Sequence, residues 1–196
     1  MTFSFDTIAA FLDISHPEEF HNDERTRASV AMIFREGQEE LELLLIQRST
    51  DESDPWSGNL AFPGGRFKPD EDARRAAERE TGEEIGLDLS NARYLGRLPD
   101  VHGAHLPLRV SCLVYGLHDE TTGLVLNGEV SDTFWIGIDD LAVPERHIIS
   151  SVSFGGEAFE VPAIYIPRPD TPVLWGLTHR LVMQFLHILR SRDGRG

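Results

Sequence analysis

Three glutamates, Glu80, Glu83 and Glu84, stand close together near the end of a predicted helix. Spacings of three and four residues place their carboxylates on one helix face, where each close pair of like charges costs roughly 0.2–0.5 kcal/mol. The negative end of the helix dipole adds a penalty of roughly 0.3–1 kcal/mol per carboxylate. A divalent cation would reverse the sign of both effects, because Mg²⁺ takes carboxylate oxygens as ligands and binds substrate phosphates through its remaining positions. The spacing therefore favours a magnesium site.

The segment that carries these glutamates has the sequence pattern of a loop, a helix and a stop. Phe62-Pro63-Gly64-Gly65 predicts a tight loop, because glycine and proline are typical of turns. Asp70 follows Pro69 and is the expected N-cap of the helix. Glu71 is then expected to open the helix, where a carboxylate suits the dipole. Gly86 is expected to end the helix.

Elements elsewhere along the chain are predicted to form a mixed sheet around this segment. The runs 28–35 and 41–48 are rich in Val, Ile and Leu and predict a β-hairpin. Apolar residues recur at helical spacing in 5–12 and after Pro172, where the pattern includes Leu174. Further strands are expected at 59–62, 92–97, 108–117, 130–138, 148–154 and 157–166, with a loop at 98–107 and a short helix or turn at 139–141. Strands interleaved with helices imply helices on both faces of the sheet.

Composition and charge exclude several classes of partner. The chain has 196 residues, enough for one domain with a sizeable core. Its formal net charge of -15 repels polyanions, so no nucleic-acid partner is expected. Residues 1–12 lack the basic residues of a signal peptide and no apolar run reaches membrane-spanning length, so we expect a cytoplasmic protein with no membrane partner. The single cysteine, Cys112, fits a reducing compartment and is expected to be a small buried hydrophobe.

The glycine turn and the glutamates together resemble a family motif. The segment from Gly65 to Leu87 is similar to the Nudix box, G-x5-E-x7-R-E-U-x-E-E-x-G-U, in which U is an aliphatic residue. Every fixed position is filled, and the one departure is Thr81, a β-branched residue at the first U position. The resemblance implies an α/β fold, a Nudix-type α/β/α sandwich with a mixed β-sheet. Residues 1–27 would be an N-terminal helix and linker, and residues 28–196 the single Nudix hydrolase domain.

The resemblance also implies a reaction and the residues that carry it. Nudix hydrolases cleave a diphosphate bond in a nucleoside diphosphate derivative, a small-molecule substrate, with Mg²⁺ or with Mn²⁺ in its place. Glu80, Glu83 and Glu84 are then catalytic residues and metal ligands, and the Gly64 carbonyl is a frequent extra ligand. Arg79 would hold the glutamates in position, although its spacing also fits a surface ion pair with Glu83.

The box does not fix the general base, which is left to the loops. Glu129 precedes a predicted strand and is the first candidate, because similar family members place a carboxylate there. A turn glutamate in water fits the same sequence. His102 and His105 are alternatives for the base or for a phosphate contact, and simple exposure also explains them.

Three further residues are candidates for binding the substrate. Arg48 ends the predicted strand 41–48, which precedes the box in the sequence. It either binds a substrate phosphate or is a solvated strand end. Trp56 either stacks on an adenine or plugs the core beneath its loop. Arg66, next to the glycine turn, is the third candidate.

Segments outside the box resemble the coenzyme A diphosphatase branch of the family. They are 44–49, Gly58, 62–65 and 175–178. The chain departs from that branch at Trp56, where a histidine is usual, and in a loop at 49–62 that is about one residue longer. Coenzyme A or a related compound is the leading substrate, with ADP-ribose, a nucleotide sugar or a (d)NTP as alternatives. A non-catalytic Nudix-fold module that binds a nucleotide or a protein is the alternative from another class, and a homodimer is expected by analogy.

Overall fold

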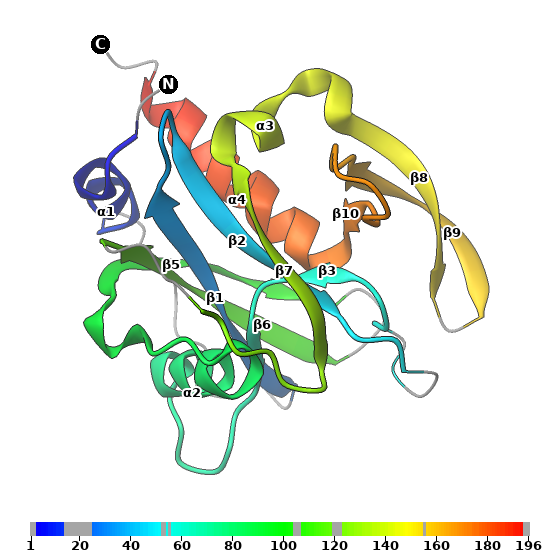
Figure 1. Ribbon diagram of the computed structural model, residues 1–196, viewed down its shortest axis with the longest axis horizontal. Helices are drawn as coiled ribbons and strands as arrows, with labels where there is room; N and C mark the ends of the chain where they lie inside the picture. Colours follow the sequence, from blue (N-terminus) through cyan, green and yellow to red (C-terminus); the bar gives the residue numbers. More distant parts are fainter. Residues whose placement is uncertain are drawn as a thin grey trace.

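The computed structural model describes residues 3–13, 25–51, 54, 56–103, 107–118, 123–154 and 156–193. Within these residues, two sheets and four α-helices form the fold (Figure 1). The larger sheet contains β1 (Thr26–Glu36), β2 (Leu41–Arg48), β3 (Leu60–Ala61), β4 (Gly64–Arg66), β5 (Arg93–His102), β6 (Leu108–Leu117) and β7 (Val130–Gly137). The smaller sheet contains β8 (His147–Phe154), β9 (Glu157–Ile164) and β10 (Leu174–Trp175). The α-helices are α1 (Phe5–Asp13), α2 (Ala73–Ile85), α3 (Ile138–Ala142) and α4 (Gly176–Asp193), and short 3₁₀ turns lie at Leu89–Asn91 and Pro144–Arg146.

The larger sheet is mixed, as the sequence predicts. β1 pairs antiparallel with β2 and β4. It also pairs parallel with β6 over the full length of β6, from Thr26 opposite Leu108 to Arg35 opposite Leu117. Alternate residues of β1 belong to two hydrophobic clusters, with Phe34 in one and Ile33 in the other. The first cluster includes residues of α1 and α4, and the second includes residues of α2. Helices therefore cover both faces, which confirms the α/β/α sandwich.

The smaller sheet is a long hairpin that extends to the right side of the molecule in Figure 1. β8 and β9 pair antiparallel from His147 opposite Ile164 to Phe154 opposite Glu157, which confirms the predicted second hairpin. β10 adds to the far edge of β9 and leads directly into α4. The hairpin thus lies next to the start of the last helix.

Four local predictions are wrong, each for a physical reason. The N-cap of α2 is Asp72 and not Asp70, because the Asp72 carboxylate accepts a hydrogen bond from the Arg75 N–H at 2.8 Å. Asp70 instead adopts a positive φ of 65° in the preceding turn, and Glu71 therefore precedes the helix. The predicted loop at 98–107 begins too early, since β5 continues to His102 with Leu98 in the core. Leu174 lies in β10 and not in the last helix.

Other expectations on single elements are confirmed. Gly86 ends α2 in the left-handed conformation, with a φ of 68° and its N–H donating to the Gly82 carbonyl. Cys112 is fully buried, and burial raises the pKa of its thiol. None of the helices in the described part of the chain has the length and apolarity to span a bilayer.

Candidate functional site

The inner face of α2 brings one carboxylate into the protein interior. Ala76, Ala77, Thr81, Glu84 and Ile85 are the buried residues of this helix. The two alanines allow the helix to pack closely against the sheet, and the Thr81 hydroxyl donates to the Ala77 carbonyl at 2.7 Å. The hydroxyl is thereby satisfied within the helix, which explains how a threonine occupies a buried aliphatic position.

Glu84 is only 2% exposed, and its surroundings decide its charge. Burial raises its pKa from the ordinary 4.5 to about 7, because a desolvated carboxylate favours the neutral form. The Gly64 N–H, which donates to Glu84 Oε2 at 2.8 Å, and the positive charge of Arg48 oppose this shift. The negative charges of Glu80 and Glu129 add to it. A cation placed among these carboxylates would stabilise the ionised form of all three.

The glycine turn allows the backbone to approach the glutamates closely. Gly64 has a φ of 152°, and a Cβ there would collide with the backbone of Ser29 and Val30. A Cβ on Gly65 would lie 2.6 Å from Glu80 Oε1. Any side chain at either position would therefore displace the strand β1 or the Glu80 carboxylate.

Arg79 connects three glutamates on the outer side of α2. It makes a two-pronged ion pair with Glu71, at 2.6 Å from Nε and 2.9 Å from Nη2. Its Nη1 donates to Glu80 at 2.8 Å and to Glu83 at 2.9 Å, and its Nη2 donates to the Arg66 carbonyl. The hydrogen bonds from Arg79 and from the Lys68 N–H lower the pKa of Glu71 to about 2. Arg79 thus fixes the turn and the helix to each other.

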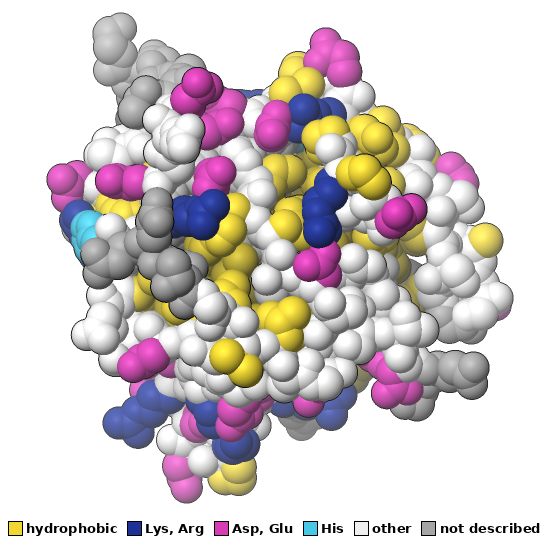
Figure 2. Space-filling model, in the orientation of Figure 1, with side chains coloured by type: hydrophobic (Ala, Val, Ile, Leu, Met, Phe, Trp, Pro, Cys, Tyr) yellow, Lys and Arg dark blue, Asp and Glu magenta, His cyan; other side chains and the backbone are white. Residues whose placement is uncertain are grey.

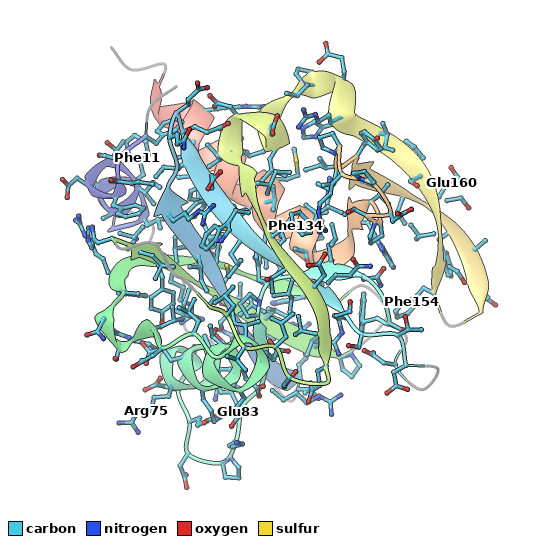
Figure 3. All side chains as sticks on the ribbon, viewed as in Figure 1. Phe11, Arg75, Glu83, Phe134, Phe154 and Glu160 are labelled. Carbon is cyan, nitrogen blue, oxygen red and sulfur yellow. The ribbon has the colours of Figure 1, made fainter. Side chains whose placement is uncertain are left out.

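A cavity of about 830 Å³ is lined by most of these side chains. Its walls include Glu80, Glu83, Glu84 and Glu129 and the cationic residues Arg48, Arg66, Lys68 and Arg79, and we call it the charged cavity. Figure 3 shows Glu83 on α2, in the lower part of the view. The lower part of Figure 2 carries intermixed acidic and basic side chains. Carboxylates and cations therefore line one space that is large enough for a small ligand.

The donor set of the charged cavity fits a hard divalent cation. Carboxylate and carbonyl oxygens are the ligands that Mg²⁺ takes, and buried Glu84 lies where such a charge would be stabilising. Within the described residues, no three His, Cys, Asp or Glu side chains are arranged as a group that could hold a metal ion. Glu80 and Glu83 each point an oxygen at the Arg79 guanidinium, at 2.8 and 2.9 Å.

A comparison with known proteins shows the family to which the chain belongs. A model of the NUDIX domain matches residues 24–153, well over half of the chain. The chain belongs to the Nudix hydrolase family of enzymes.

Individual Nudix proteins resemble this chain at moderate identity. Nudix hydrolase 3 of Caenorhabditis elegans is 32% identical over 147 residues, covering 67% of this chain and 60% of that protein. The peroxisomal coenzyme A diphosphatase ndx-8 of the same organism is 31% identical over 147 residues, covering 72% of this chain and 61% of that protein. This chain thus spans less than two thirds of the length of either relative. A crystal structure of a MutT/nudix family protein from Enterococcus faecalis shares the fold, with a TM-score of 0.58 at 17% identity over 96% of this chain and 70% of that one.

The loops of this Nudix chain bring most of the predicted rim residues to the charged cavity. Glu129 is held there by its own N–H, which donates to Asn127 Oδ1 at 2.8 Å, and by its carbonyl, which accepts from the Ser49 N–H. Arg66 lines the cavity from β4. Arg48 lines it too, but its guanidinium is held by Asp54, with Nη2 2.7 Å from Oδ2. Trp56 lies at the same wall and packs on Phe154.

Of the two predicted histidines the structure describes His102, and it does not place this residue at the carboxylates. His102 ends β5, where its ring contacts Arg25 at 2.9 Å, and it is not among the described residues that line the charged cavity. His105 lies outside the described residues. The structure adds Asp54 and Lys68, which the sequence analysis missed. Lys68 lies close to the glycine turn and just before Glu71, which is a usable signal, whereas Asp54 has no distinctive spacing in its polar loop.

Proposed function

We propose that the charged cavity hydrolyses a diphosphate bond in a nucleoside diphosphate derivative. One observation carries the proposal: Glu80, Glu83, Glu84 and Glu129 line the same cavity as Arg48, Arg66 and Lys68. Diphosphates resist hydrolysis because their negative oxygens repel nucleophiles, so catalysis needs positive charge on those oxygens and an activated water. This cavity offers cationic side chains for the oxygens and carboxylates for a metal and for the water.

The residues divide the work in this proposal as follows. Glu80, Glu83, Glu84 and the Gly64 carbonyl would hold Mg²⁺ or Mn²⁺, which when bound supplies charge neutralisation and acidifies a water. Lys68 and Arg66 place positive charge beside the diphosphate, and Arg79 positions Glu80 and Glu83. Glu129 accepts the proton of the attacking water. The water oxygen bonds to one phosphorus, the bridging P–O bond breaks, and the leaving phosphate keeps the bridging oxygen.

Coenzyme A or a related compound is the substrate that we propose first. Segments 44–49, 62–65 and 175–178 resemble the coenzyme A diphosphatase branch. The relative named as a coenzyme A diphosphatase is 31% identical to this chain. ADP-ribose, nucleotide sugars and nucleoside triphosphates are the alternative substrates.

The test is a hydrolysis assay on a substrate panel, with and without Mg²⁺, with products identified by mass. The panel contains coenzyme A, ADP-ribose, a dinucleoside polyphosphate, a sugar nucleotide and a nucleoside triphosphate. We expect metal-dependent cleavage of at least one diphosphate. A chain that cleaved none of them would support the binding-module alternative, and retention of every box glutamate argues against that alternative.

A matched pair of variants ties the activity to the site. Glu83→Gln removes a charge from the cavity wall and is expected to lower turnover by about a hundredfold or more. Glu78→Gln makes the same change on the same helix, but Glu78 pairs with Arg74 at 2.7 Å and does not line the charged cavity. Equal rates for the two variants would contradict the site assignment.

A further inference from the structure

A second cavity lies beside the charged one and has a different character. It measures about 470 Å³ and is formed by one face of the β8–β9 hairpin and the first turn of α4. We call it the apolar cavity, since its walls are mainly aromatic and aliphatic: Trp56, Leu108, Phe154, Phe159, Val161 and Leu177. Figure 3 labels Phe154, the last residue of β8.

The two cavities are neighbours that share walls. Trp56, Leu108, Trp175 and Leu177 line both of them. A ligand whose diphosphate lies among the carboxylates therefore has an apolar space next to it, into which its remaining part can extend. Apolar cavities with a few polar groups at the edge are typical of small-molecule sites.

The aromatic side chains form one uneven wall and not a slot. Trp56 and Phe154 have ring centroids 4.7 Å apart and planes inclined by 54°, and the Phe154 and Trp175 planes are inclined by 81°. Trp56 and Trp175, the pair nearest to parallel, have centroids 6.1 Å apart and planes inclined by 35°. Two rings that sandwich a planar base must be parallel, with room for a third ring between them. Here the rings pack on each other instead. An uneven apolar wall suits a flexible chain that adapts its shape.

Polar contacts fix this wall from the side of the charged cavity. The Trp175 Nε1–H donates to Asn59 Oδ1 at 2.9 Å. The Trp56 backbone N–H donates to Asp54 Oδ1 at 3.0 Å, and the other Asp54 oxygen accepts from Arg48. Through Asp54, the position of Trp56 is thereby linked to Arg48, which lines the charged cavity. The wall is preorganised before any ligand binds.

We infer that the apolar cavity binds a flexible apolar arm of the substrate, carried on the phosphate opposite the nucleoside. The inference rests on the proposed function, because it takes the reacting diphosphate to lie in the charged cavity. It narrows the substrate class to diphosphates in which a chain of methylene or similar groups follows the second phosphate. It also assigns Trp56 and the β8–β9 hairpin to specificity.

The experiment uses esters of adenosine diphosphate whose terminal phosphate carries a methyl, butyl or hexyl group. Full burial of each methylene contributes about fourfold to binding. We therefore expect kcat/KM of the full chain with Mg²⁺ to rise by well over tenfold from the methyl to the hexyl ester. Equal kcat/KM values along the series would overturn the inference.

Two matched substitutions on β9 locate the effect. Val161→Phe puts a ring into the apolar cavity and is expected to lower the hexyl-to-methyl ratio of kcat/KM by about tenfold. Ala158→Phe adds the same ring to an exposed position of the same strand that does not line the cavity, and the ratio should remain that of the natural chain. If both variants lowered the ratio equally, the inference would be wrong.

A binding measurement keeps the inference separate from the proposed function. Trp56 and Trp175 line the apolar cavity, so in EDTA the hexyl ester should shift tryptophan emission to shorter wavelength, whereas the methyl ester should not. A chain that hydrolysed none of the esters but showed this shift would lack the proposed activity and still have the arm site. Hydrolysis without chain-length dependence and without the shift would leave the activity and remove the arm site.

Discussion

Glu71 and Glu84, near the two ends of α2, show how differently two carboxylates of one motif can be held. Glu71 accepts two hydrogen bonds from Arg79 and one from the Lys68 N–H, and its pKa is lowered to about 2. Glu84 is buried, accepts one backbone N–H from Gly64, and has a pKa raised to about 7. A guanidinium partner dominates in the first case and desolvation dominates in the second.

We propose that this difference separates a structural carboxylate from one that binds a ligand. The charge of Glu71 is already neutralised within the protein, so we expect it to hold Arg79 in place. Glu84 has no ion-pair partner among the described residues, and the Gly64 N–H and the positive charge of Arg48 only partly offset the cost of its buried charge. The motif thus contains one carboxylate, Glu71, that is paired with an arginine, and another, Glu84, that has no ion-pair partner among the described residues.

Glu84→Gln is the substitution with the largest expected effect. It keeps the shape of the side chain and an acceptor for the Gly64 N–H, but removes the charge. We expect turnover with Mg²⁺ to fall by about a thousandfold, the upper range for loss of one electrostatic contact in an active site. Near-normal turnover would show that Glu84 is not part of the catalytic machinery.

The same variant should be more stable than the natural chain when no metal is present. The folded pKa of Glu84 is raised from 4.5 to about 7, so its stability cost is absent below pH 4.5, grows as the pH rises, and is complete above about 7. Glu84→Gln should therefore raise the free energy of unfolding in EDTA by up to about 3 kcal/mol at pH 8 and leave it unchanged at pH 4. Urea unfolding at the two pH values measures this, and lower stability at pH 8 would contradict the comparison.

Arg79→Ala should have the second largest effect. Without the guanidinium, Glu80 and Glu83 lose the donor that holds them, and the turn loses its link to the helix. We expect turnover to fall by about a hundredfold, with partial rescue by added guanidinium ion. Arg74→Ala is the control, because Arg74 on the same helix pairs with Glu78 and does not line the charged cavity. Failure of guanidinium to rescue would indicate misfolding and not lost positioning.

Glu71→Gln should have a smaller effect on turnover, about tenfold, because Arg79 keeps its contacts with Glu80 and Glu83. The main effect of this variant is expected on the free energy of unfolding at acidic pH. Since the folded pKa of Glu71 is lowered, the pair stabilises the fold above pH 4.5 and is lost as the pH falls toward 2. The stability difference between the natural chain and the variant, measured by urea unfolding, should therefore shrink between pH 5 and pH 3. An unchanged difference would mean that Arg79 does not hold an ionised Glu71.

Patterns within one segment predicted the fold well. The apolar strands 41–48 and 108–117 coincide with β2 and β6, because long runs of Val, Ile and Leu favour strands that are buried on both faces. The errors occur where a tertiary contact decides the end of an element. β5 continues past Leu98 because its next residues still pair with β6, and Asp72 takes the N-cap from Asp70 because of its own side-chain contact.

The candidate site was predictable only where it is local in sequence. The box spacing located Glu80, Glu83, Glu84 and Arg79 together. The pairing of Arg48 with Asp54 and the packing of Trp56 on Phe154 join segments whose meeting depends on the completed fold. No spacing in the sequence encodes the apolar cavity, because its wall comes from the hairpin, the loop before β3 and the start of α4.

Thr81→Val is the substitution with the smallest expected effect, and it changes the buried face of α2 that also carries Glu84. Thr81 is fully buried, and its hydroxyl already bonds to the helix carbonyl of Ala77. Valine has the same branched shape, and the Ala77 carbonyl keeps its place in the helix ladder, so loss of the hydroxyl leaves no unsatisfied donor. We expect the free energy of unfolding to change by less than about 1 kcal/mol and turnover to stay within about twofold. A large loss of turnover with unchanged stability would show that the hydroxyl helps to hold Glu84. The buried residues of α2 would then have to be counted among those that prepare the site for a ligand.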